Sequence, residues 1–174
     1  MLSDRPKKLE MIAALLREES TLALATADEL GVPDVAPLFY LVDEGLTLYW
    51  LSSAASSHSQ NLNKTPRAAV TVYRHAEHWK TICGVQMRGS VTAVTEQARC
   101  NALIKLYVER FQLGKIFRLA INKCTLYTFR PDFVRYIDNS KRFGYKFEFT
   151  LEQQDFDPAF SSRIQRPGES RLPG

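Results

Sequence analysis

The chain has 174 residues, of which 45% are hydrophobic and 24% charged. This length allows one compact domain with a hydrophobic core and is too short for two ordinary domains. No apolar run approaches the roughly 18 to 20 residues that a membrane-spanning helix requires, so we expect no membrane insertion. The net charge of +4 is mild. Much of it lies near the chain ends, so nucleic-acid binding is not indicated.

The cysteines and histidines indicate a cytoplasmic protein without a metal site. Cys83, Cys100 and Cys124 are widely spaced and odd in number, which predicts neither a disulfide framework nor a thiolate zinc site. His75 and His78 lie close together, but a closed metal site there needs carboxylates from distant segments. The first residues are charged and lead into no uninterrupted apolar stretch, so we expect no secretory signal.

Short strands and two longer helices are predicted along the chain. Apolar residues at helical spacing predict amphipathic helices over Pro6–Glu19 and Thr95–Phe111. Strands are predicted over Thr21–Ala27, Val35–Leu41, Leu46–Leu51, Ala68–Tyr73, Lys80–Ala93, Thr125–Arg130, Phe133–Asp138 and Tyr145–Phe149, with Pro131 as an interruption. We therefore expect residues 1–150 to form one mainly β (α+β) domain, a small antiparallel barrel with flanking helices. Residues 151–174 are predicted to be a polar C-terminal tail.

A hydroxyl-rich turn after the strand Leu46–Leu51 is the strongest functional signal. It places four polar residues between a strand end and the first turn of a short helix: Ser52, Ser53, Ser57 and His58. Free backbone N–H groups and the positive end of a helix dipole bind phosphate in this setting. The same residues also fit a turn that only caps the helix, because serine is a common capping residue.

Further segments surround this turn in a fixed order. They are an apolar strand with an internal proline (Val35 to Phe39), a strand running into Ser52-Ser53, the segment Ser57-His58-x-x-Asn61-Leu62, then Pro66-x-Ala68-x-Val70, and Gly84-Val85-Gln86-x-x-Gly89. In this order the chain resembles the FMN-binding split-barrel superfamily typified by pyridoxamine 5'-phosphate oxidase. The resemblance is clear over residues 21–94 and weaker through residue 149.

The resemblance implies a set of cofactor-binding residues. The turn would hold the FMN phosphate, and Pro37, Leu38 and Phe39 would lie beside the flavin ring. Gln86, which shares a strand face with Gly84 and Arg88 by alternation, would bind the polar edge of the ring.

Two aromatic or basic residues complete the implied set. Trp79 would stack on the ring or line the substrate side, and Arg142 could take the role of a late cation from the partner subunit.

Each implied role has a simpler alternative. Pro37 and Phe39 also fit one face of a barrel strand, Gln86 fits a surface or dimer contact, and Trp79 fits ordinary packing. Arg142 fits a solvated basic turn.

The chain also departs from the oxidase at the phosphate turn. The oxidase has Ser-Arg-Lys where this chain has Ser56-Ser57-His58. A charged or N–H-donating His58 would still suit a phosphate. Losing two permanent cations predicts weaker phosphate binding, since charge-assisted hydrogen bonds are the stronger ones.

The functional hypothesis is an FMN-dependent oxidoreductase, a homodimeric flavoprotein with its cofactor at the subunit interface. A hydride would pass through flavin N5 to or from a small-molecule substrate, and no catalytic side chain is identified. Because the oxidase's cationic substrate-binding signature is missing, we do not expect pyridoxamine phosphate as that substrate. The alternative is a split-barrel module that binds flavin or haem without significant turnover.

Overall fold

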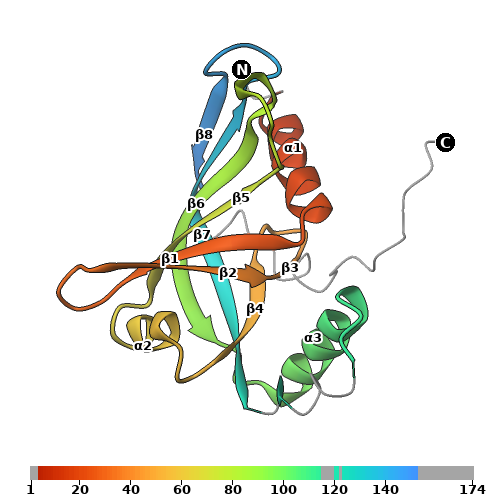
Figure 1. The fold of residues 1–174 in the computed structure, drawn as a ribbon. Helices are drawn as coiled ribbons and strands as arrows, with labels where there is room; N and C mark the ends of the chain where they lie inside the picture. The colour runs from red at the N-terminus through yellow and green to blue at the C-terminus, as the bar shows by residue number, and fades with distance from the viewer. Residues whose placement is uncertain (1–3, 115–119, 122, 153–174) are drawn as a thin grey trace.

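The computed structural model describes residues 4–114, 120–121 and 123–152. One curled, antiparallel sheet of eight strands forms the body of the protein, in the order β2-β1-β5-β6-β7-β4-β3, with β8 paired to β7 (Figure 1). Its strands are β1 (Thr21–Ala27), β2 (Pro33–Phe39), β3 (Leu41–Val42), β4 (Leu48–Ser53), β5 (Arg67–Tyr73), β6 (Cys83–Ala93), β7 (Cys124–Asp138) and β8 (Lys146–Thr150). The helices are α1 (Arg5–Glu18), α2 (Ser57–Lys64) and α3 (Gln97–Arg110). The predicted fold, a split barrel with flanking helices, is confirmed.

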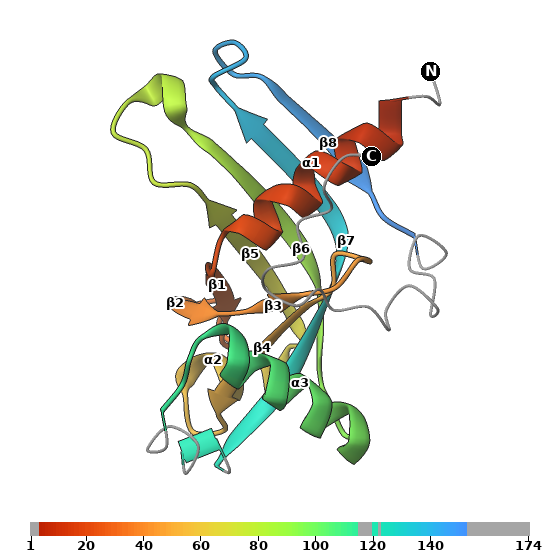
Figure 2. The ribbon, with the colours of Figure 1, turned by 90° about the vertical axis from the view of Figure 1, so that its right-hand side faces the viewer.

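The core fills the inner side of the curl. Ile12 and Leu16 of α1 pack there with Leu24, Trp50 and Phe129 from the sheet, all of them fully buried. Figure 2 shows α1 lying across the strands on this side. A second, smaller cluster joins α3 to the other side of β4. Because successive side chains of a strand point to opposite faces, each strand also presents an outer face, which the helix α1 does not cover.

The predicted break at Pro131 is wrong, because β7 continues through it. On one side of β7, the paired strand changes near Pro131. β4 pairs with β7 as far as Phe129, and β8 pairs with β7 from Phe133 onward. On the other side, a bulge in the β6–β7 register places Gly89 opposite Pro131. The bulge interrupts the ladder beside Pro131, and a bulge is a setting in which a strand tolerates proline.

Other strand boundaries also differ from the prediction, and three of the differences have a local structural reason. Val35–Leu41 is divided into β2 and β3 at Tyr40, whose hydroxyl donates to the Leu16 carbonyl (2.6 Å). β4 begins at Leu48, because Leu46 lies in a turn with a positive φ of 62°. β6 begins at Cys83, after a 3₁₀ turn over Trp79–Thr81.

The helix α2 closes one end of the barrel on its inner side. Leu62 belongs to the main core, and Asn61 donates from Nδ2 to Thr26 Oγ1 (3.1 Å) on the inner face of β1. No helix in the described part of the chain is both long and apolar enough to cross a membrane. The predicted polar tail lies outside the described residues, apart from Leu151 and Glu152.

Candidate functional site

The serine-rich turn is a compact hydrogen-bonded unit. Ser52 Oγ lies 2.5 Å from His58 Nε2, and Ser56 Oγ lies 3.0 Å from the same nitrogen. Ser56 also caps α2, accepting from the Ser59 N–H at 3.4 Å. The capping interpretation of this turn is therefore confirmed for Ser56.

His58 itself is buried in this unit. Burial lowers the pKa of His58 below its usual value, and the carboxylate of Asp34 opposes that shift only in part. The imidazole is therefore neutral near pH 7 and is one partner in the serine network. It offers a phosphate an N–H at most, and no permanent cation.

The turn nevertheless keeps accessible donors. Ser53 and Ser57 are exposed. The backbone N–H groups of Ser57 and His58, in the first turn of α2, receive no acceptor from the residues that the structure describes. Such orphan N–H groups at a helix start bind anions. The residues present thus fit a phosphate group, although more weakly than a cationic turn would.

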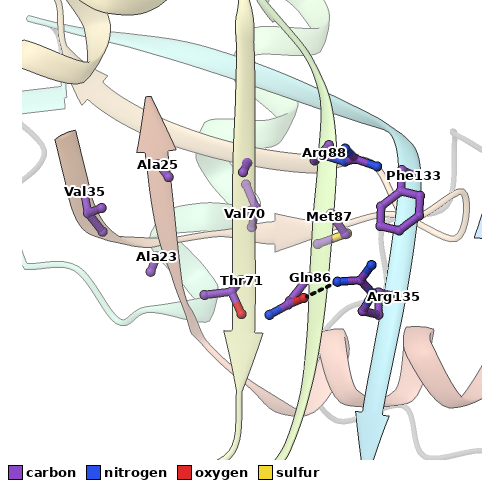
Figure 3. A pocket seen from close by; sticks show the side chains of 11 residues that line it. Ala23, Ala25, Val35, Val70, Thr71, Gln86, Met87, Arg88, Phe133 and Arg135 are labelled. Atoms are coloured by element: carbon purple, nitrogen blue, oxygen red, sulfur yellow. Dashed lines mark hydrogen bonds between the residues drawn. The ribbon is translucent and has the colours of Figure 1, made fainter. Parts of the chain in front are cut away.

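A pocket of about 430 Å³ lies on the outer face of the sheet (Figure 3). It extends across five strands and is lined by Ala23, Ala25, Val35, Ala69, Val70, Thr71, Gln86, Met87, Arg88, Phe133 and Arg135. Its floor over β1 and β5 is hollow because three neighbouring outward positions are alanine. Polar and aromatic side chains from β6 and β7 form the other side. This combination of an apolar floor and a few polar groups is typical of small-molecule sites.

Gln86 accepts a hydrogen bond from Arg135 within the pocket. The strand register aligns Ala23, Thr71, Gln86, Arg135 and Glu148 in one row across the sheet. Arg135 donates from Nε to Glu148 (2.9 Å) and from Nη1 to the Gln86 side-chain oxygen (3.4 Å). The amide nitrogen of Gln86 then faces away from Arg135, as Figure 3 shows. A flat ring with a polar edge would meet a hydrogen-bond donor here.

The three predicted ring-side residues of β2 lie on different faces. Pro37 is on the outer face, opposite Ala23 of β1. Leu38 packs against the main core, so its side chain points inward. Phe39 stacks on Phe111 at a centroid distance of 4.6 Å. Pro37 and Phe39 are exposed on the outer side, whereas Leu38 offers only its backbone to a ligand there.

Trp79 and Arg142 lie near each other, at the ends of two hairpins. Trp79 contacts Phe143 edge to face at 5.4 Å, and its carbonyl accepts from the Asn139 amide (2.9 Å). Arg142 lies over the ring of Tyr145 at 5.9 Å. Neither lines the outer pocket, and their cofactor roles remain predictions.

The turn and the pocket lie on opposite faces of the sheet. Asp34, whose charge acts on His58, alternates along β2 with Val35, which lines the pocket. Thr26, the α2 contact, alternates along β1 with Ala25 of the pocket floor. Within one chain, therefore, the two halves of the predicted cofactor site are not brought together.

The family model described as pyridoxamine 5'-phosphate oxidase matches residues 9–127. The chain belongs to the pyridoxamine 5'-phosphate oxidase family. A pyridoxine/pyridoxamine 5'-phosphate oxidase of Nitrobacter hamburgensis is 31% identical over 106 residues, which are 60% of this chain and 47% of that protein. The chain thus spans about half the length of the curated oxidases it matches. A UPF0306 protein of Klebsiella pneumoniae is 28% identical over 146 residues, covering 79% of this chain and 92% of that one.

Solved structures share the fold of this family member. An FMN-binding, pyridoxamine 5'-phosphate oxidase-related protein from Nostoc punctiforme superposes with a TM-score of 0.64 at 13% identity, covering 86% of this chain and 92% of that one. HutZ, the haem storage protein of Vibrio cholerae, superposes with a TM-score of 0.60 at 20% identity, covering 81% and 92%. The fold thus occurs in proteins that carry either pigment.

Of the pocket lining, sequence reasoning assigned a binding role to Gln86 alone and missed, among others, the cationic and aromatic residues Arg88, Phe133 and Arg135 of this family member. Arg88 shares its strand face with Gln86, so alternation along β6 was a signal that it faces the same space. Phe133 and Arg135 enter the pocket only through the β6–β7 pairing, which joins segments about 50 residues apart and leaves no local trace in the sequence.

Proposed function

We propose that this protein is an FMN-binding oxidoreductase that works as a homodimer with flavin sites shared between subunits. The single observation that carries the proposal is the placement of the serine-rich turn and the Gln86 pocket on opposite faces of the sheet in one chain. A second copy would bring the pocket of one subunit to the turn of the other. Family membership and the FMN-binding relative of the same fold support flavin as the cofactor.

The roles of the chain's own residues follow from their chemistry. The N–H groups of Ser57 and His58 would hold the phosphate, with the hydroxyls of Ser53 and Ser57 nearby. In the facing subunit, the Gln86 amide would donate to the polar edge of the ring. Bound FMN would supply hydride chemistry at its N5 atom. The protein would contribute position, exclusion of water and hydrogen bonds.

The competing proposal is a pigment-binding module without turnover, which holds flavin or haem. The neighbour HutZ carries haem by its name. In this chain the buried His58 has its Nε2 engaged by two serine hydroxyls, and His75 and His78 are exposed. None of the three histidines is therefore presented to the outer pocket, which favours flavin over haem.

Titration of the purified protein with FMN, riboflavin and haemin tests the cofactor. We expect quenching of FMN fluorescence and weaker binding of riboflavin, which lacks the phosphate. Replacing Ser57 and His58 together by alanine should reduce the preference for FMN over riboflavin. Haemin binding with a Soret band and no FMN binding would refute the proposal. Oxidation of reduced nicotinamide by the FMN-loaded protein would separate an oxidoreductase from a module without turnover.

A mixing experiment tests the shared site. The Ser57/His58 double variant is defective at the turn, and Gln86→Ala is defective at the pocket. If each site combines the turn of one subunit with the pocket of the other, unfolding and refolding the two variants together restores about a quarter of the sites, because half the dimers are mixed and each has one intact site. No recovery, or a monomer by light scattering in the presence of FMN, would refute sharing.

A further inference from the structure

Among the described residues, Arg88 is the pocket cation whose charge no neighbouring carboxylate balances. The other pocket arginine, Arg135, forms an ion pair with Glu148 at 2.9 Å. Asp132, adjacent in sequence to Phe133 of the pocket, is paired with Arg67 instead. The pocket lining contains no acidic residue. The pocket therefore carries an uncompensated positive charge at one edge.

The backbone fixes where this charge sits. A bulge between Arg88 and Gly89 sets Arg88 directly opposite Phe133 of β7. The Arg88 guanidinium lies 4.3 Å from the Phe133 ring centroid, and that of Arg135 lies 5.5 Å from the same ring. Figure 3 shows the three side chains together at one side of the pocket. The ring restricts the guanidinium of Arg88, so less freedom is lost when an anion binds.

The chemistry of this arrangement selects a ligand class. A guanidinium pairs with a carboxylate through two parallel hydrogen bonds. The floor of Ala23, Ala25 and Ala69 is apolar and free of bulky side chains, which suits a planar ring beside Arg88. We propose that the outer pocket binds a planar small molecule bearing a carboxylate, with the carboxylate on Arg88 and the ring over the alanines. That this molecule is the hydride partner of the flavin rests on the proposed function.

Fluorine NMR with 4-fluorobenzoate and 4-fluorobenzamide tests the pocket independently of flavin. The two probes share ring and size and differ in charge. We expect the wild-type protein to bind the benzoate more tightly. Arg88→Gln should weaken the benzoate about tenfold and leave the benzamide unchanged, since hydrogen bonds to charged groups are the strong ones and this one is partly exposed. Arg88→Lys should give an intermediate loss of benzoate affinity, because lysine keeps the positive charge but lacks the paired N–H donors of the guanidinium.

Arg130→Gln is the matched control. Arg130 is an exposed arginine of β7 outside the pocket lining, so its replacement should leave both probes unaffected. Equal binding of acid and amide by the wild type, no binding of the benzoate, or equal losses in the Arg88 and Arg130 variants would overturn the proposal.

Flavin titrations of the same variants separate this proposal from the proposed function. If Arg88→Gln weakens FMN and not riboflavin, Arg88 holds the flavin phosphate, and the substrate assignment is overturned while flavin binding stands. If the wild type binds no flavin but still distinguishes benzoate from benzamide through Arg88, the pocket assignment stands and the proposed function fails.

Discussion

Gly89→Ala should destabilise the protein more than any other glycine-to-alanine change for which the structure describes the surroundings. Gly89 lies at the bulge in the β6–β7 pairing, opposite Pro131. A Cβ atom built on Gly89 would lie 2.1 Å from the carbonyl oxygen of Arg130 and 2.8 Å from Pro131 Cα. Both atoms belong to the backbone of a paired strand, so neither can rotate away.

The size of the effect follows from this overlap. Carbon and oxygen atoms without a bond between them rarely approach closer than about 3 Å, so the two strands must separate locally by about 1 Å. Overpacking of a well-packed interior costs about 1–3 kcal/mol when side chains can adjust. Because backbone must move here, we expect the free energy of unfolding to fall by about 3 kcal/mol or more. The displaced bulge should also move Arg88 off Phe133 and weaken 4-fluorobenzoate binding.

Urea unfolding followed by circular dichroism measures this loss. With an m-value of about 2 kcal/mol per molar urea, the midpoint should fall by about 1.5 M. Gly114→Ala is the control, because a Cβ there would contact no described residue within 4 Å and Gly114 has no positive φ. A loss below about 1 kcal/mol in Gly89→Ala, or equal losses in both variants, would show that the described β6–β7 approach is wrong.

Three further predictions concern the turn and the pocket. The pKa of His58 is lower in the folded protein than in the unfolded chain, so the unfolded chain binds the proton first as pH falls. The free energy of unfolding should therefore decrease below about pH 6.5. Urea titrations of His58→Gln should show a weaker decrease with pH, and the same decrease as in the wild type would contradict the burial argument. Ala69→Phe should fill the pocket floor and abolish 4-fluorobenzoate binding in the fluorine NMR titration. Because Ala69 is exposed, the free energy of unfolding should change by no more than about 0.5 kcal/mol. Retained binding would place the ligand elsewhere. Glu148→Gln should remove the ion pair of Arg135 and strengthen benzoate binding in the fluorine NMR titration. The free energy of unfolding should fall by less than about 1 kcal/mol, because the ion pair is partly exposed. Weaker benzoate binding would mean that Glu148 orients Arg135 rather than neutralising its charge.

Local sequence signals were sufficient for the fold class and for much of the chain's organisation. Helical spacing in α1 and α3, and period-two alternation in the strands, report which face of each element is buried, and that depends on neighbours a few residues away. The turn from Ser52 to His58 was likewise predicted from the local sequence, because helix capping is an interaction between neighbouring residues. Its position between β4 and α2 is confirmed, while its role in phosphate binding remains a prediction.

Where long-range pairing decides the outcome, the sequence was insufficient. Pro131 suggested a strand break, and only the exchange of β4 for β8 beside β7 shows why the strand continues. A charged His58 was compatible with the turn, but burial against Ser52 makes it neutral.

The pocket itself is a tertiary feature. Alanines of β1 and β5, Gln86 of β6 and Arg135 of β7 come into one row only because the register across five strands is fixed by the whole sheet. The sequence by itself determined which residue types are available and on which face each lies. The tertiary structure decided which faces meet, since strand pairing brings together residues whose separation along the chain carries no information about their distance.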